Sequence, residues 1–148
     1  MNNKGVIAVI SGPSGVGKGT ICTYLAEKYD DFFLSVSATS RLPRPNEVDG
    51  VHYHFKTPEQ FKEMIENDEF LEYAGYVDKF YGTPKAPCYE HVEKGINAIL
   101  EIEVQGGMMV KEKEPDITTA VSPLGASIRF ESDNYGAGLR FAAEVDKE

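Results

Sequence analysis

The stretch that decides the fold runs from residue 5 to residue 20, with the sequence GVIAVISGPSGVGKGT. Its first seven residues form a short, apolar, β-branched run, which is typical of a buried parallel strand. A glycine-rich turn with the spacing G-x-x-x-x-G-K follows at Gly12–Lys18. Over residues 18–29, apolar side chains then recur at i, i+4 and i+8, which predicts a helix. The stretch therefore predicts a strand, a tight turn and a helix in direct succession.

The turn between this strand and this helix predicts a phosphate-binding loop. Glycines let backbone N–H groups converge on phosphate oxygens, and the helix N-terminus adds a partial positive charge. We expect Lys18 to lie between the β- and γ-phosphates and to follow the charge as it moves. A magnesium-binding Ser or Thr usually follows the lysine, but Gly19 stands here. We therefore expect Thr20 to contact the α-phosphate and the metal to be held by water and phosphate, with no direct protein ligand. The predicted nucleotide-contacting residues are Gly12, Pro13, Ser14, Gly15, Val16, Gly17, Lys18, Gly19 and Thr20.

Outward from this stretch, the chain alternates between predicted strands and helices. Apolar runs predict strands over residues 32–36, 51–55 and 98–104, short paired strands over 70–83, and helices over 89–94 and 106–113. A capping box at Thr57-Pro58-Glu59-Gln60 marks the start of a further helix. This alternation predicts an α/β fold with a parallel sheet wrapped by helices.

Composition narrows the class of protein. The chain has 148 residues, the length of one domain, and a net charge of −9 at pH 7. Such an acidic chain is a poor candidate for binding nucleic acid or an anionic membrane. Cys22 and Cys88 are too few for a disulfide framework and are expected to be reduced. The first apolar run is too short for a membrane span. We expect a soluble, cytoplasmic protein, and the sequence leaves its oligomeric state unknown.

A second motif, TSRLPRPNEVDGVHYHF, occupies residues 39–55. Arg41 and Arg44 lie three positions apart in a predicted loop, and arginine binds phosphate through paired hydrogen bonds. Tyr53 and Tyr81 can donate hydroxyl hydrogen bonds to the same anion. The motif therefore predicts a second anion-binding site.

The second motif matches the guanylate kinase signature T-S-R-x-x-R-x-x-E-x-x-G-x-x-Y-x-F at every fixed position. Together with the phosphate loop, Gly82-Thr83-Pro84 and the segment 101–106 (EIEVQG), it makes residues 1–114 resemble a bacterial guanylate kinase. The resemblance implies a P-loop nucleoside monophosphate kinase-like parallel sheet flanked by helices. It implies that residues 37–83 form a small inserted GMP-binding β/α segment that closes over the nucleotide. It also implies transfer of the ATP γ-phosphate to GMP, giving GDP and ADP, with Mg²⁺ as cofactor.

The resemblance further implies individual roles. It makes Lys18, Arg41 and Arg44 catalytic. A carboxylate suits guanine, because guanine N1–H and its 2-amino group are adjacent donors that adenine lacks. Glu101 and Glu103, two apart on a predicted strand, face the same side, one toward the base and the other toward the metal region or an arginine. The implied GMP-site residues are Ser37, Arg41, Arg44, Tyr53 and Tyr81 at the phosphate, and Glu72, Thr83 and Glu103 at the base, with Glu101 beside them.

The resemblance stops after residue 114. A guanylate kinase would continue with another core strand, an arginine-rich lid and further helices, whereas residues 115–148 show only one possible weak strand near 117–123 and a weak hairpin around 133–134. We therefore expect a truncated domain, with the last part of the sheet and the lid missing or replaced and a tail that is irregular or weakly ordered. The alternative is a catalytically impaired nucleotide-binding remnant. The intact phosphate loop argues against an interaction module, and the second motif argues against a different nucleoside monophosphate kinase.

Overall fold

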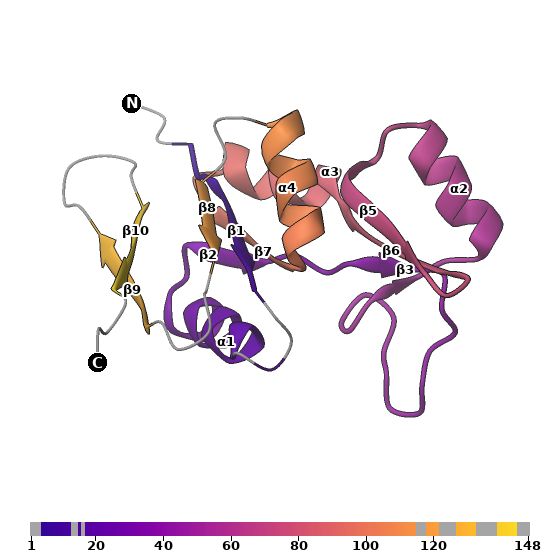
Figure 1. Ribbon diagram of the computed structural model, residues 1–148, viewed down its shortest axis with the longest axis horizontal. Coiled ribbons are helices and arrows are strands. Elements are labelled where there is room, and N and C mark those ends of the chain that lie inside the picture. The colour runs from indigo at the N-terminus through magenta and orange to yellow at the C-terminus, as the bar shows by residue number, and fades with distance from the viewer. Residues whose placement is uncertain are drawn as a thin grey trace.

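Over the part of the chain that it describes, the computed structural model contains two four-stranded sheets and a separate two-stranded hairpin (Figure 1). It describes residues 4–12, 15, 17–114, 118–121, 127–132 and 139–144, the last three ranges by their backbone alone. The strands are β1 (Ile7–Ser11), β2 (Phe32–Leu34), β3 (Ala38–Thr39), β4 (His54–Phe55), β5 (Phe70–Tyr76), β6 (Lys79–Pro84), β7 (Asn97–Ile102), β8 (Thr118–Val121), β9 (Ser127–Ser132) and β10 (Leu139–Glu144). The helices are α1 (Lys18–Lys28), α2 (Pro58–Glu66), α3 (Lys85–Glu93) and α4 (Val104–Lys113).

The first sheet is parallel and has the order β2-β7-β1-β8. Helix α1 lies on one side of it, and α3 and α4 lie on the other (Figure 1). A sheet covered on both faces needs strands that are apolar on both sides. This requirement explains why every residue of β1 is buried. The predicted α/β fold with a helix-flanked parallel sheet is confirmed.

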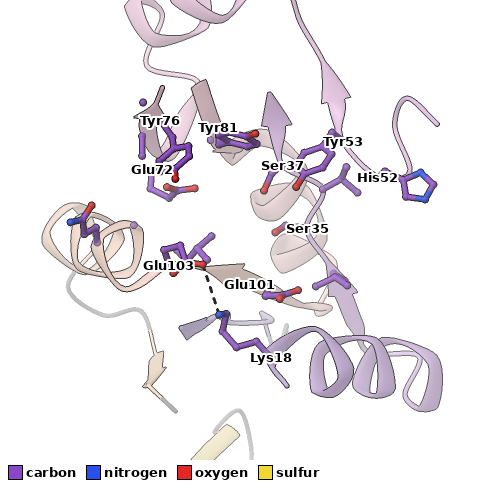
Figure 2. Close-up of a pocket in the computed structure, with 18 of the residues that line it drawn as sticks. Lys18, Ser35, Ser37, His52, Tyr53, Glu72, Tyr76, Tyr81, Glu101 and Glu103 are labelled. Carbon is purple, nitrogen blue, oxygen red and sulfur yellow. Dashed lines mark ion pairs between the residues drawn. The ribbon is translucent and has the colours of Figure 1, made fainter. Parts of the chain in front are cut away.

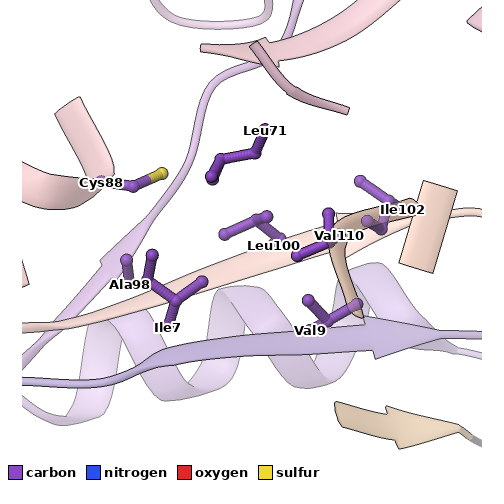
Figure 3. Close-up of a cluster of buried hydrophobic side chains, with 8 residues drawn as sticks. All are labelled: Ile7, Val9, Leu71, Cys88, Ala98, Leu100, Ile102 and Val110. Atoms are coloured by element: carbon purple, nitrogen blue, oxygen red, sulfur yellow. The ribbon is translucent and has the colours of Figure 1, made fainter. Parts of the chain in front are cut away.

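Successive side chains of β1 and β7 enter two different clusters, because neighbouring residues of a strand face opposite sides. One cluster lies under α3 and α4 and also takes in Leu71 of β5 (Figure 3). Its buried members are Ile7, Val9, Leu71, Cys88, Ala98, Leu100, Ile102 and Val110. The other cluster lies under α1 and consists of Ile10, Cys22, Leu25 and Ile99.

The second sheet has the order β4-β3-β6-β5 and is covered by α2. Helix α2 begins with the predicted capping box: the Thr57 hydroxyl accepts from the Gln60 N–H at 3.1 Å, and the Gln60 side chain accepts from the Thr57 N–H at 2.9 Å. Phe61 of this helix is buried and stacks on Phe70 of β5, with ring centroids 4.6 Å apart. The α2 helix therefore fixes the small sheet through an aromatic core of its own.

Several predicted element boundaries are wrong. The strand expected over residues 51–55 is reduced to His54–Phe55, because residues 49–53 form a turn closed by the Gly50 N–H donating to the Tyr53 carbonyl at 2.8 Å. Helix α3 begins at Lys85, four residues before the predicted start, because Pro87 is tolerated in a first helical turn. The strand expected to reach residue 104 ends at Ile102.

Beyond residue 114 the described backbone is more regular than expected. Strand β8 runs parallel to β1, with Ala8 opposite Thr118, and so adds an edge strand to the first sheet. Strands β9 and β10 pair antiparallel as the predicted hairpin, with Phe130 opposite Phe141. The expectation of an irregular tail is therefore wrong for these strands. The turn predicted around residues 133–134 lies outside the described residues.

Both cysteines are buried and unbonded, as expected. Burial raises the pKa of the Cys22 thiol and of the Cys88 thiol to about 12, so neither forms the reactive thiolate near neutral pH. Among the residues that the structure describes, no helix is both long and apolar enough to cross a bilayer.

Candidate nucleotide-binding site

A cleft of about 830 Å³ separates the first sheet from the second and collects predicted site residues from both (Figure 2). The first sheet and its phosphate-loop turn contribute Gly15, Lys18, Glu101 and Glu103. The second sheet and its connections contribute Ser37, Tyr53, Glu72 and Tyr81. Figure 2 shows these two groups on opposite sides of the cleft.

The glycine-rich turn has the backbone geometry that a phosphate-binding loop needs. Gly15 and Gly17 have φ angles of 81° and 88°, in the left-handed region that favours glycine. A Cβ atom at either position would meet no atom within 4 Å, so the space beside them is open. Of the other predicted loop residues, Gly12 is buried, and Pro13, Ser14 and Val16 lie outside the described residues.

Lys18 opens helix α1, and its side chain is 8% exposed. Its ammonium donates to the Gly12 carbonyl at 2.7 Å and lies 3.9 Å from a carboxylate oxygen of Glu103. The lysine charge is therefore held at the turn, at the edge of the cleft. Thr20 is exposed on the first turn of α1 and does not line the cleft.

Gly19, at the usual serine or threonine position, lies against Glu101. A Cβ atom on Gly19 would sit 3.4 Å from a Glu101 carboxylate oxygen, so the glycine leaves room for that carboxylate beside the phosphate loop. Among the described residues, no three His, Cys, Asp or Glu side chains lie close enough together to bind a metal.

Glu101 and Glu103 both line the cleft, but they do not share a strand. Glu101 belongs to β7, whereas Glu103 follows its end and precedes the first residue of α4, with extended backbone angles. Both side chains lie on the Lys18 side of the cleft (Figure 2).

Glu72 lines the opposite wall and is paired with the fully buried Thr83, which does not itself line the cleft. They are partners across β5 and β6, and the Thr83 hydroxyl donates to a Glu72 carboxylate oxygen at 2.7 Å. Burial raises the pKa of Glu72, and the hydrogen bonds from Thr83 partly oppose this shift. The arrangement presents a fixed hydrogen-bond acceptor to the cleft, which is suited to a ligand with adjacent N–H donors.

Arg41 lies beside the cleft in a cage of aromatic and acidic groups. Its two terminal nitrogens donate to the two Glu47 carboxylate oxygens, each at 2.9 Å. Its guanidinium carbon lies 5.2 Å from the ring centre of Tyr53, whose ring meets Tyr81 edge-on. The hydrogen bonds with Glu47 hold the pKa of Arg41 above its usual range and lower that of Glu47 to about 2.

Glu47 holds the Arg41 guanidinium, although it is not among the predicted site residues. Besides Arg41, it accepts the Arg44 backbone N–H at 2.7 Å, so it holds both the Arg41 side chain and the backbone at Arg44. Its fixed place in the signature was the available signal. The Arg44 side chain is exposed, and neither arginine lines the cleft as it stands.

A phosphate-loop turn at the end of a central parallel strand, facing the buried Glu72 carboxylate across one cleft, defines an α/β nucleotide-binding protein of the phosphate-loop class. Comparison with known families makes this more specific. The guanylate kinase family model matches residues 4–121, so the chain belongs to the guanylate kinase family.

Individual relatives agree with this result. The chain is 58% identical over 115 residues to a guanylate kinase from Clostridium perfringens (strain SM101), covering 78% of the chain and 53% of that protein. It is 50% identical over 145 residues to one from Clostridioides difficile (strain 630), covering 97% of the chain and 70% of that protein. The crystal structure of guanylate kinase from Anaplasma phagocytophilum superposes with a TM-score of 0.65 at 32% identity, over 81% of the chain and 60% of that structure. The chain thus spans about half the length of the Clostridium perfringens relative.

Proposed function

We propose that this chain is an ATP:GMP phosphotransferase, which moves the γ-phosphate of ATP to GMP and yields ADP and GDP. The observation that carries the proposal is the cleft itself. It has the Lys18 phosphate loop on one wall and the buried Glu72, paired with Thr83, on the other. Two nucleotides bound to these walls would meet phosphate to phosphate.

On the ATP side, the backbone amides of the loop and the Lys18 ammonium bind the phosphate chain. The acceptor is a GMP phosphate oxygen, which is already anionic, so neither a general base nor a covalent enzyme intermediate is needed. Catalysis then consists of positioning the two phosphates and neutralising their charge. Magnesium ion, held by phosphate oxygens and water, would supply part of that neutralisation.

On the GMP side, we assign the phosphate to Ser37, Arg41, Arg44, Tyr53 and Tyr81, and the base to Glu72, Thr83 and Glu103. Support comes from the segment 37–83, which carries most of these groups. The start of this segment is held to its end at β6, since the Thr39 hydroxyl donates to the Phe80 carbonyl and the Ser40 hydroxyl accepts from the Phe80 N–H, both at 2.9 Å. Because neither arginine lines the cleft as it stands, GMP binding requires the segment to close, which would exclude water from the reaction.

The test mixes the purified 148-residue chain with GMP, ATP and magnesium and follows ADP, with GMP binding measured separately by calorimetry. We expect GMP-dependent ADP formation. Arg44→Ala should lose GMP binding, because the exposed guanidinium is assigned to the GMP phosphate. Lys18→Met should lower turnover about 100-fold or more while GMP still binds.

Lys62→Ala is the matched control, because it removes an exposed positive charge from α2 in the same segment. It should leave binding and turnover unchanged. GMP binding without ADP formation would replace the kinase with a nucleotide-binding protein. Full GMP binding by Arg44→Ala would overturn the phosphate-site assignment.

A further inference from the structure

We propose that Gly106, in the first turn of α4, is a positioning residue that keeps the Glu72 carboxylate in place for guanine. The proposal rests on the proposed function, because it assumes that Glu72 binds the base. Gly106 lies on helix α4, which packs on the first sheet, whereas the Glu72–Thr83 pair lies on the second sheet.

The approach of the two residues is very close. A Cβ atom on Gly106 would lie 2.7 Å from one Glu72 carboxylate oxygen, 3.2 Å from its carboxyl carbon and 3.5 Å from its Cγ. Atoms at the first of these distances overlap, so any larger residue at position 106 would displace one partner. Both residues also line the cleft, which places the contact at its wall.

The carboxylate, rather than the helix, is the partner that gives way. Helix α4 is fixed against the first sheet by Val110, which is fully buried, and by Gly107, where a Cβ would lie 3.4 Å from the Ser11 hydroxyl oxygen and 3.5 Å from Val9. The carboxylate is the far end of a flexible side chain. A methyl group at position 106 therefore turns it away from the Thr83 hydroxyl, with which its other oxygen now bonds.

The helix itself gives no reason for this glycine. Apart from proline, glycine is the least favourable residue in a helix interior, and α4 contains two glycines in succession. Gly106→Ala should therefore favour the helix while disturbing Glu72. Weaker GMP binding despite a more favourable helix residue would distinguish a positioning role from a merely structural one.

The experiment compares Gly106→Ala, Glu72→Ala and the double variant, with Gly107→Ala as the matched control on the next residue of the same helix. Calorimetry measures GMP affinity. Loss of a hydrogen bond to a charged group predicts that Gly106→Ala weakens GMP binding by about tenfold to hundredfold. In the Glu72→Ala background the same change should have no further effect, because no carboxylate remains to be displaced. Gly107→Ala should bind GMP as the parent chain does.

A second measurement does not depend on GMP. The Glu72 carboxyl signal, assigned by its loss in Glu72→Ala, is titrated by ¹³C NMR in the parent chain and in Gly106→Ala. Burial raises the pKa of Glu72 in the parent chain, so displacement toward solvent should return it toward the ordinary glutamate value. The melting temperature of Gly106→Ala should fall only modestly, because the gain in helix propensity offsets part of the lost Glu72–Thr83 hydrogen bond.

Additive losses in the double variant or an unchanged Glu72 titration would each overturn the proposal. If the parent chain binds no GMP but the Glu72 titration shifts as expected, the proposed function fails and the positioning of Glu72 by Gly106 stands. If GMP binds equally well to the parent chain and to Gly106→Ala, the proposed function stands and the positioning role fails.

Discussion

At the scale of single residues, the position of the Arg41 side chain depends on its carboxylate partner, Glu47. Arg41 is flexible on its own, but the two-point contact with Glu47 fixes the plane of its guanidinium, and the Tyr53 ring fixes its position. The sequence predicted Arg41 from its type and spacing. The signature marks Glu47 as a fixed position, but it does not show that Glu47 pairs with Arg41, because an acidic residue in a polar loop is ordinarily solvated.

The Arg41–Glu47 pair should make stability depend on pH in a defined direction. Glu47 has a pKa of about 2 in the folded chain, against an ordinary value of 4.5. A lowered folded-state pKa stabilises the fold fully above the unfolded value, and this contribution is lost as the pH falls through the folded value. We therefore expect Glu47→Gln to lower the free energy of unfolding at neutral pH, and this difference to shrink below about pH 4.5 and vanish near pH 2.

Urea unfolding of the parent chain and Glu47→Gln across this pH range measures that difference. Glu27→Gln, at an exposed position on α1, is the control and should change stability little at any pH. A Glu47→Gln difference that stays constant down to the lowest pH would contradict the prediction.

At the scale of helices and strands, the elements with strong local signals were predictable. Strand β1, helix α1 and the capped start of α2 each follow from a residue pattern within a dozen positions. Strand β3 was not predicted, because two residues cannot show an alternation. Its place depends on pairing with Gly82 and Tyr81 of β6, far along the chain.

Gly82 shows how tertiary contact selects a residue within a strand. A Cβ atom there would lie 2.8 Å from the buried Phe70 ring and 3.0 Å from the Glu72 carbonyl oxygen. Gly82→Ala should therefore overpack the second sheet and lower the free energy of unfolding by about 1–3 kcal/mol, as measured by urea denaturation.

Gly75→Ala, in the same hairpin, provides the comparison. A Cβ atom at Gly75 meets the Phe80 ring at an ordinary 3.5 Å, so this change should leave stability within about 0.5 kcal/mol. Equal losses in the two variants would mean that strand propensity, and not the contact with Phe70, decides the effect.

At the scale of the whole molecule, the cleft depends on strand β5, which contributes buried side chains to the hydrophobic cores of both sheets. In β5, Phe70 packs with Phe61 beneath α2, whereas the next residue, Leu71, packs into the core of the first sheet (Figure 3). The Asp68 carboxylate, just before β5, adds ion pairs to Lys85 of α3 at 2.7 Å and to Lys113 of α4 at 3.6 Å. No local sequence pattern could predict that β5 and Asp68 connect the two sheets, because these contacts depend on where the first sheet lies.

Leu71→Ala should affect both the stability of the fold and the binding of GMP. Leu71 is 2% exposed, so its truncation leaves a cavity and should lower the free energy of unfolding by about 2–5 kcal/mol. The cavity opens beside Glu72, so GMP affinity should fall as well. Leu25→Ala is the matched control, because Leu25 is similarly buried at 3% but lies on α1 and packs into the separate cluster between α1 and the first sheet. It should cost comparable stability in urea unfolding and leave the calorimetric GMP affinity unchanged. If Leu71→Ala bound GMP as tightly as the parent chain, strand β5 would hold the two sheets together without controlling the geometry of the cleft between them.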